Sequence, residues 1–269
     1  MRARNSRLVS FFSAPLLALG LALAPARADD KADKKEVKKP EPPRVAVALP
    51  LALKTGVTNK IVVRGLNLTN VIELRFTNDA VKAVSVLGKK TKADVPKEAD
   101  AKKVGDTQVS AEIFLPADTG AGTNWFTLAS PEGVSEPRPL VFFTPADLLE
   151  EKEPNGGFRE AQMLRIGQTM GGTIKEAGDV DVFRFQGTAG QFIRLEVFAA
   201  GAGSPLDSLI LLHDGEGHTL ASNDDVGGNR DSILELKLTV AGPHYISVMD
   251  ANDKAGPTHV YLLRLSVRE

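Results

Sequence analysis

Oxygen-bearing side chains recur at every second position in one short part of the chain. Glu151, Glu153 and Asn155 stand at alternate positions in the segment "EKEPNGG". In an extended chain, alternate side chains point to the same face and lie about 6.6–6.8 Å apart. Pro154 disfavours a helix and holds Glu153 in an extended conformation. The segment therefore predicts one face that carries carboxylate and amide oxygens.

A second pair of acids has the same spacing. Asp179 and Asp181 follow Gly178 at the start of a predicted strand. If the two acidic segments lie side by side, their carboxylates repel one another, and a divalent cation removes that repulsion. Calcium binds six to eight oxygen ligands at about 2.3–2.6 Å. The candidate calcium ligands are Glu151, Glu153, Asn155, Asp179 and Asp181.

Other interpretations of both segments stay open at this point. Charged residues beside proline and glycine are also common in solvated linkers, and a Gly-Asp-x-Asp sequence also forms turns in which aspartate caps backbone amides. The spacing taken alone favours these interpretations over a metal site. The register of an EF-hand loop is missing from the chain.

The sequence lacks the motifs of common hydrolases and nucleotide-binding proteins. It contains no Gly-x-Ser-x-Gly elbow and no Walker A loop. The four histidines have no His-x-x-x-His helical spacing, so surface histidines are favoured over a zinc site. The acidic, glycine-rich stretch at residues 222–229 is favoured as an Asx-rich turn over a second cation site. We predict that the protein is not an enzyme.

The first residues have the pattern of a signal peptide. Three arginines precede an apolar run over residues 8–24, and an Ala-Arg-Ala sequence ending at Ala28 matches a cleavage site. A proline interrupts the run, which is short for a membrane span of about 20 apolar residues. We predict cleavage of residues 1–28, a secreted or periplasmic location, and no membrane span after cleavage.

Composition and charge narrow the function further. The chain has no cysteine, which excludes disulfides, thiolate chemistry and a lipid anchor on cysteine. The net charge of −1 gives no indication of a nucleic-acid partner. Residues 146–269 hold 19 acidic and 11 basic residues, whereas residues 29–145 hold 15 acidic and 18 basic residues. An acidic second half suits a cation such as calcium better than a phosphate.

The chain divides into a charged segment and two β-rich regions. Residues 29–44 contain 11 charged residues of 16 and are predicted to be a disordered linker. Residues 45–145 predict an immunoglobulin-like (Ig-like) β-sandwich, because short apolar runs alternate with turn residues. The runs expected to be strands are residues 60–65, 71–76, 108–116 and 124–128. Residues 88–106 are charged and lack alternation, so we predict a long exposed loop there.

Residues 146–269 predict a second all-β domain. Ile193, Leu195 and Val197 alternate with polar residues and share one face of a strand. The runs expected to be strands are residues 181–186, 191–198, 208–212, 232–238, 245–249 and 260–267. Only residues 160–164 fit a helical turn. The predicted fold class is all-β: an Ig-like β-sandwich followed by a jelly-roll-type antiparallel β-sandwich.

Each β-rich region is similar to a known family. The segments "IVVRGLNLTNVIELRF" and "VSAEIFLPADTGAGTNWFTLASPEGVS", with a turn at Gly56, make residues 46–143 resemble an IPT/TIG-like immunoglobulin-like domain. Residues 150–267 contain, in order, "EKEPNGGFREAQML", "GGTIKEAGDVDVFRF", "GTAGQFIRLEV", "DSLILLHDGEGHTLASNDD" and "AGPHYISV". They resemble the bacterial pre-peptidase C-terminal (PPC) family, which is related to collagenase collagen-binding domains.

The PPC resemblance implies a calcium site at the acidic segment and the Asp-x-Asp pair. Gly156 departs from the family pattern, because calcium-binding members commonly carry a further aspartate there. Collagen binding is not expected, because Tyr245 and Tyr261 lie in apolar strands and are interpreted as core residues.

These observations predict an exported, non-catalytic binding or adhesion protein. Its calcium-stabilised sandwich would recognise an extracytoplasmic protein or polysaccharide. Two alternatives stay open. The chain could be an accessory or targeting module for a separately encoded secreted peptidase, or an undetected hydrolase acting at the Asp/Asn-rich loop of residues 222–229.

Overall fold

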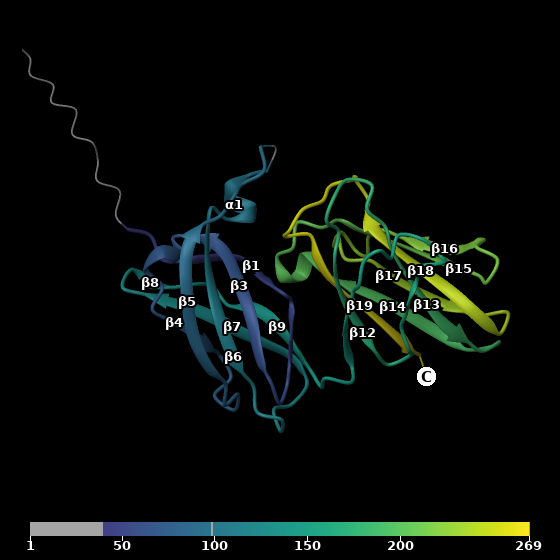
Figure 1. The fold of residues 1–269 in the computed structure, drawn as a ribbon, viewed down its shortest axis with the longest axis horizontal. Helices are drawn as coiled ribbons and strands as arrows, with labels where there is room; N and C mark the ends of the chain where they lie inside the picture. The colour runs from purple at the N-terminus through teal and green to yellow at the C-terminus, as the bar shows by residue number, and fades with distance from the viewer. Residues whose placement is uncertain (1–39, 98, 269) are drawn as a thin grey trace, which may run out of the picture. The chain divides into compact units, whose positions relative to one another are not determined.

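Two β-sandwiches follow one another along the chain, the first drawn in blue to teal and the second in green to yellow (Figure 1). The computed structural model describes residues 40–97 and 99–268, and the chain from Pro40 onward forms one compact unit. The predicted signal peptide, residues 1–28, and most of the predicted charged linker lie outside the described residues. In the described part of the chain, no helix has the length and apolar character needed to cross a membrane.

The first sandwich contains a sheet of order β1-β3-β6-β5 and a sheet of order β2-β9-β7-β4, in which β8 pairs with β7. Its strands are β1 (Arg44–Leu49), β2 (Ala52–Lys54), β3 (Thr58–Leu66), β4 (Glu73–Phe76), β5 (Val84–Lys92), β6 (Thr107–Phe114), β7 (Gly122–Ser130), β8 (Gly133–Val134) and β9 (Arg138–Phe143). Ile61 and Ile113 of one sheet belong to the same buried apolar cluster as Phe126 and Phe142 of the other. Burial of this apolar surface is what holds the two sheets together.

The region predicted as a long loop, residues 88–106, is only partly a loop. Strand β5 continues to Lys92 and pairs with β6, and a short helix α1 (Ala101–Val104) follows. Two further short 3₁₀ turns, η1 (Leu68–Asn70) and η2 (Ala200–Ala202), occur elsewhere. The prediction failed because β5 lies at the edge of its sheet and is largely exposed, so backbone pairing forms it without an apolar face.

The second sandwich contains two five-stranded sheets, of order β10-β12-β19-β14-β17 and β11-β13-β18-β15-β16. Its strands are β10 (Leu148–Glu150), β11 (Gln162–Met163), β12 (Thr169–Thr173), β13 (Asp181–Gly187), β14 (Phe192–Phe198), β15 (Ser208–His213), β16 (Thr219–Asn223), β17 (Ile233–Lys237), β18 (Gly242–Asp250) and β19 (Val260–Val267). Phe183 and Ile246 of one sheet and Leu195 and Leu263 of the other share its buried core. The all-β sandwich prediction is confirmed.

Two features of the second sandwich differ from the predictions, namely the direction of two strand pairs and the structure of residues 160–164. The short strands β10 and β11 pair in parallel with β12 and β13, whereas the other pairs of this sandwich are antiparallel. Parallel pairing is available to them because each is joined to its neighbour by a connection longer than a hairpin. The helical turn predicted at residues 160–164 is wrong, because β11 begins at Gln162.

Candidate metal centre

The acidic segment reaches the sandwich through backbone pairing. Strand β10 ends at Glu150, and the Glu151 amide still donates to the Gly171 carbonyl at 2.9 Å. The following residues are not a regular strand, so the expected extended geometry is wrong there. The Asn155 carbonyl then accepts a hydrogen bond from the Val182 amide at 2.9 Å. These two bonds, rather than strand alternation, bring the segment to the start of β13.

Three of the predicted ligands lie together at this point. One carboxylate oxygen each from Glu153, Asp179 and Asp181 lie within 4.8 Å of one another. Two oxygens bound to one calcium ion at about 2.3–2.6 Å can be no more than about 5 Å apart. The carboxylate group is therefore compact enough for one cation. Its members range from the exposed Glu153 to the fully buried Asp181.

Asp181 has the least favourable environment of the group. Its side chain is 0% exposed. The Tyr261 hydroxyl donates to Oδ2 at 2.5 Å, but Oδ1 has no hydrogen-bond partner among the described residues. Burial, together with the nearby negative charge of Glu151, raises the pKa of Asp181 to about 8. The protein thus holds a carboxyl group where its charged form is poorly compensated.

Asn155 gives a second, independent observation. Its side chain is also 0% exposed, and neither Oδ1 nor Nδ2 has a hydrogen-bond partner within the described part of the chain. Buried amides are nearly always hydrogen-bonded, and leaving one without partners costs about 1–3 kcal/mol. The backbone of Asn155 is bonded to Val182, next to Asp181. The backbone therefore brings Asn155, whose buried side chain is unsatisfied, beside the start of β13, where Asp181 lies.

Glu151 lies at the margin of the carboxylate group and is held by hydrogen bonds. Its Oε2 accepts from the Thr173 amide at 3.0 Å, and its Oε1 accepts from Lys175 Nζ at 2.8 Å. The Lys175 ammonium also donates to Glu153 Oε1 at 2.8 Å. Burial alone would lower the pKa of Lys175, but the hydrogen bonds to the two glutamates raise it overall.

Sequence reasoning did not find Lys175. Its backbone amide donates to Asp179 Oδ2 at 2.7 Å, so this residue contacts three of the five predicted ligands. A lysine in a polar segment has no sequence signal of its own, because its contacts depend on the approach of residues 151–153. The ligand roles of the five predicted residues stay a prediction.

Gly156 has room for a Cβ atom. A Cβ atom at this position would lie 3.5 Å from the Val180 carbonyl oxygen, which is an ordinary contact. The space around Gly156 therefore does not require a glycine at this position.

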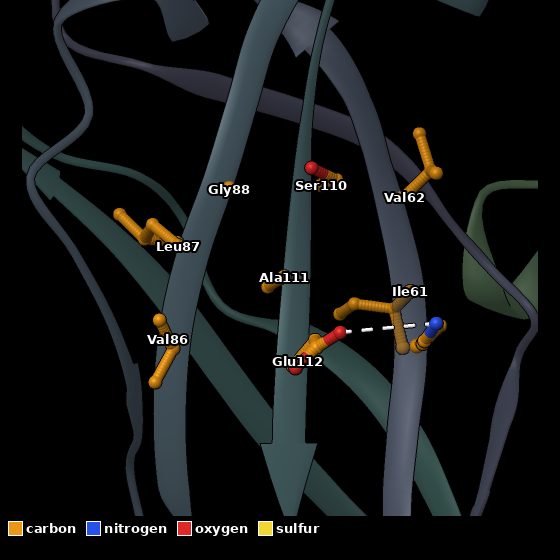
Figure 2. Close-up of a pocket in the computed structure, with 9 residues that line it drawn as sticks. Ile61, Val62, Val86, Leu87, Gly88, Ser110, Ala111 and Glu112 are labelled. Atoms are coloured by element: carbon orange, nitrogen blue, oxygen red, sulfur yellow. Dashed lines mark ion pairs between the residues drawn. The ribbon is translucent and has the colours of Figure 1, made fainter.

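The first sandwich has a hollow of about 400 Å³ over β3, β5 and β6 (Figure 2). Its lining includes Val62, Val86 and Gly88, and one ion pair joins Lys60 to Glu112 at 3.9 Å (Figure 2). Ligand sites combine apolar walls with several convergent polar groups. This hollow has an apolar lining and an exposed ion pair, so we assign it no ligand.

A serine–histidine pair in the second sandwich bears on the hydrolase alternative. His213 Nε2 lies 3.1 Å from Ser247 Oγ, and Thr219 Oγ1 lies 3.2 Å from His213 Nδ1. A catalytic triad orients the histidine with a carboxylate and exposes the serine. Here the Thr219 hydroxyl, and not a carboxylate, contacts the second ring nitrogen of His213, and Ser247 is only 5% exposed. The geometry does not support catalysis at this pair.

Parts of the chain also match known proteins. Residues 179–249 match the family model described as the bacterial pre-peptidase C-terminal domain. Over 107 residues the chain is 36% identical to a probable subtilase-type serine protease of Deinococcus radiodurans. That match covers 39% of this chain and 15% of the relative. The chain therefore spans only a small part of the length of that protease.

Solved structures give a weaker likeness. The pre-peptidase C-terminal domain of a collagenase from Bacillus anthracis is 19% identical, with a TM-score of 0.33, over 43% of this chain and 100% of that domain. A mixed-linkage glucan-utilisation SGBP-B protein of Bacteroides ovatus is 11% identical, with a TM-score of 0.25, over 78% of this chain and 74% of that chain. At TM-scores below 0.5 neither likeness carries an argument about function.

The PPC resemblance is confirmed for the part of the second sandwich that matches the family model, residues 179–249. This range includes both aspartates of the candidate site and ends within β18. The IPT/TIG-like resemblance of residues 46–143, and the predicted domain boundary between residues 145 and 146, stay predictions.

Proposed function

We propose that the second sandwich binds a calcium ion at Glu153, Asp179 and Asp181, with Asn155 and Glu151 supplying further oxygens. The observation that carries this proposal is the pair of fully buried side chains, Asp181 and Asn155, whose Oδ1 atoms lack a hydrogen-bond partner among the residues described. A cation would supply the missing partner for both oxygens and compensate the charge of the carboxylates.

In this proposal calcium acts as a structural clamp. The ion would hold residues 151–155 against the start of β13. The preceding residue, Glu150, forms an ion pair with Lys54 at 2.7 Å, and Leu148 packs in one apolar cluster with Val47 and Leu51. The clamp would thus fix a segment that contacts strands of both sandwiches. Because calcium binds only the folded state, it would also add stability by mass action.

The task that we propose is non-catalytic binding or adhesion outside the cytoplasm, to a protein or a polysaccharide. The predicted signal peptide and the PPC match at residues 179–249 support this function. The first alternative, an accessory module for a separately encoded secreted peptidase, is favoured by the identity to a probable subtilase-type protease. Recovery of a peptidase with the tagged protein from the native cell envelope or medium would favour that alternative, and recovery of polymer without peptidase would favour adhesion.

Thermal unfolding with calcium or with a chelator tests the calcium site. At calcium concentrations about 100-fold above Kd, binding adds about 2.7 kcal/mol, which corresponds to roughly 5–10 °C in Tm. The double variant Asp179→Ala, Asp181→Ala should lose this shift. The matched control is Asp224→Ala, Asp225→Ala, which removes two acids from the loop after β16 and should keep it. Equal Tm values in calcium and chelator for the wild type would refute the proposal.

A further inference from the structure

Lys175 binds the same carboxylates to which we assign calcium. Its ammonium lies 2.8 Å from Glu151 Oε1 and 2.8 Å from Glu153 Oε1. Among the described residues, no other lysine or arginine forms an ion pair with these two glutamates. The acidic segment is therefore tied to the connection between β12 and β13 by a single cationic side chain.

The environment of Lys175 allows its ammonium to leave. Its side chain is 49% exposed, whereas the Glu151 side chain is 9% exposed. A lysine ammonium is a strongly hydrated point charge on a flexible stem, so it regains water readily when it is released. The backbone amide of Lys175 stays bonded to Asp179 whichever way the side chain points. The residue can thus release the glutamates without loss of the turn.

A calcium ion and the ammonium compete at these oxygens. Glu153 Oε1 forms an ion pair with the Lys175 ammonium. Glu153 also supplies one of the three carboxylate oxygens that lie within 4.8 Å of one another. Two cations bound to one carboxylate repel each other. The repulsion is stronger in a partly buried site than in bulk water. Entry of calcium is therefore favoured when the ammonium moves into solvent.

We propose that Lys175 is a displaceable internal cation, which holds residues 151–153 on the sandwich before calcium binds and sets the calcium affinity of the site. This inference rests on the proposed calcium site. It adds that Lys175, which is not one of the proposed ligands, controls the calcium affinity of the site. Metal-free protein keeps the clamp partly closed through Lys175, and calcium replaces that contact with a stronger one.

Titration of calcium into purified protein by calorimetry tests this role. Lys175→Gln keeps a polar side chain, shorter by one atom, and removes the charge, and it should bind calcium about tenfold more tightly than the wild type. Lys175→Arg keeps the charge and should bind with nearly the wild-type affinity. The matched control is Lys152→Gln, which removes an exposed lysine from the same acidic segment and makes the same change in net charge. It should change the affinity by no more than about twofold.

Two further readouts separate displacement from a simple effect of charge. Without calcium, Lys175→Gln should melt at a lower temperature than Lys152→Gln, because Lys175, unlike Lys152, forms ion pairs with Glu151 and Glu153. In the wild type, the NMR signal of the Lys175 ammonium should move to that of a solvated lysine as calcium is added, a test that needs no substitution.

The outcomes are distinguishable. Calcium affinities of Lys175→Gln and Lys152→Gln that agree within about twofold would overturn this inference and leave the calcium site standing. An ammonium signal that stays unchanged at saturating calcium would do the same, even if Lys175→Gln does not fold. Failure of calcium to bind the wild type and every variant would overturn the proposed function and this inference together.

Discussion

Arg64 in the first sandwich and Asp181 in the second are both buried ionisable residues, 5% and 0% exposed, but their surroundings differ. Arg64 Nη2 donates to the carbonyl oxygens of Asp94 at 2.7 Å and Gly105 at 3.1 Å. The backbone of the first sandwich therefore supplies acceptors to its buried cation. Asp181 has one donor, Tyr261, and the charged groups that raise its pKa are the carboxylates of Glu151 and Asp179.

The comparison shows why the candidate site lies in the second sandwich. A buried charge is tolerated when the fold supplies complementary groups, and it is costly when the fold supplies like charges. The first sandwich supplies two carbonyl acceptors to Arg64 Nη2, although Arg64 Nε has no partner among the described residues. The second leaves a negative cluster that Lys175 compensates only in part, because its ammonium contacts Glu151 and Glu153 and not Asp181.

The largest expected effects come from substitutions in the two cores. The loss of stability should be similar in the two sandwiches. Phe126→Ala and Phe183→Ala each remove a ring that is 0% exposed. Each should lower the free energy of unfolding by about 3–5 kcal/mol, through lost burial and the cavity left behind. Denaturant unfolding in calcium and in chelator measures this loss. If either loss disappears when calcium is added, the separation of core from metal site is wrong.

The next effect concerns the charge of Asp181. Its pKa of about 8 in the native state exceeds the value of about 3.9 expected in the unfolded chain. Between these pH values the native state holds a proton that the unfolded chain has lost. The stability of the metal-free protein should therefore fall as pH rises from 4 to 8.

Asp181→Asn should remove this pH dependence and raise metal-free stability at pH 8 by roughly 3–4 kcal/mol, while removing stabilisation by calcium. Asparagine can still accept the Tyr261 hydrogen bond. Melting curves at pH 5 and pH 8, each with chelator, measure the effect. At pH 5 the variant and the wild type should agree, because Asp181 is then protonated. A variant less stable than the wild type at pH 8 in chelator would contradict the assignment of an uncompensated charge.

Substitution of two adjacent glycines in β12 allows a direct comparison, with a smaller expected effect on stability. A Cβ atom on Gly172 would lie 2.3 Å from the Tyr261 hydroxyl oxygen and 2.5 Å from Glu151 Oε2. Gly172→Ala should therefore destabilise the protein by about 1–2 kcal/mol and weaken calcium binding. A Cβ atom on Gly171 meets only ordinary contacts, at 3.6 Å and beyond, so Gly171→Ala should be nearly neutral. Equal effects of the two variants in thermal unfolding would show that the close approach around Glu151 does not matter.

The smallest effect is expected at the exposed ion pair of the first sandwich. Lys60 and Glu112 lie 3.9 Å apart, with side chains 85% and 58% exposed (Figure 2). Exposed pairs of this kind contribute between about 0 and 1 kcal/mol. Glu112→Gln should change the free energy of unfolding by less than about 0.5 kcal/mol, in calcium and in chelator alike, by denaturant titration. A larger or calcium-dependent change would mean that the first sandwich also responds to the ion.

Local pattern predicted several buried strands, although it missed the largely buried strands β1 and β9 of the first sandwich. Phe183 and Phe185 alternate with residues of the opposite face, and both are buried in the core. Strand β5 was missed over residues 88–92 because its stability comes from pairing with β6 and not from an apolar face. A pattern of side chains does not record backbone pairing at the edge of a sheet.

The sequence predicted the acidic residues of the candidate site, but it did not predict the burial and contacts of the residues around them. Alternate spacing indicated Glu153, Asp179 and Asp181, whose carboxylates the structure brings within 4.8 Å of one another. The burial of Asn155 and the contacts of Lys175 depend on how residues 151–155 meet β13, which is tertiary information. These features, rather than the count of acids, distinguish the site from a solvated linker.

A crystal structure of the protein grown with calcium chloride, with anomalous diffraction data, tests the central claim most directly. We predict one calcium peak about 2.3–2.6 Å from a carboxylate oxygen of each of Glu153, Asp179 and Asp181. We also predict that the Lys175 ammonium is displaced from Glu153 in that structure. A structure at millimolar calcium with no anomalous peak among these three carboxylates would contradict the account.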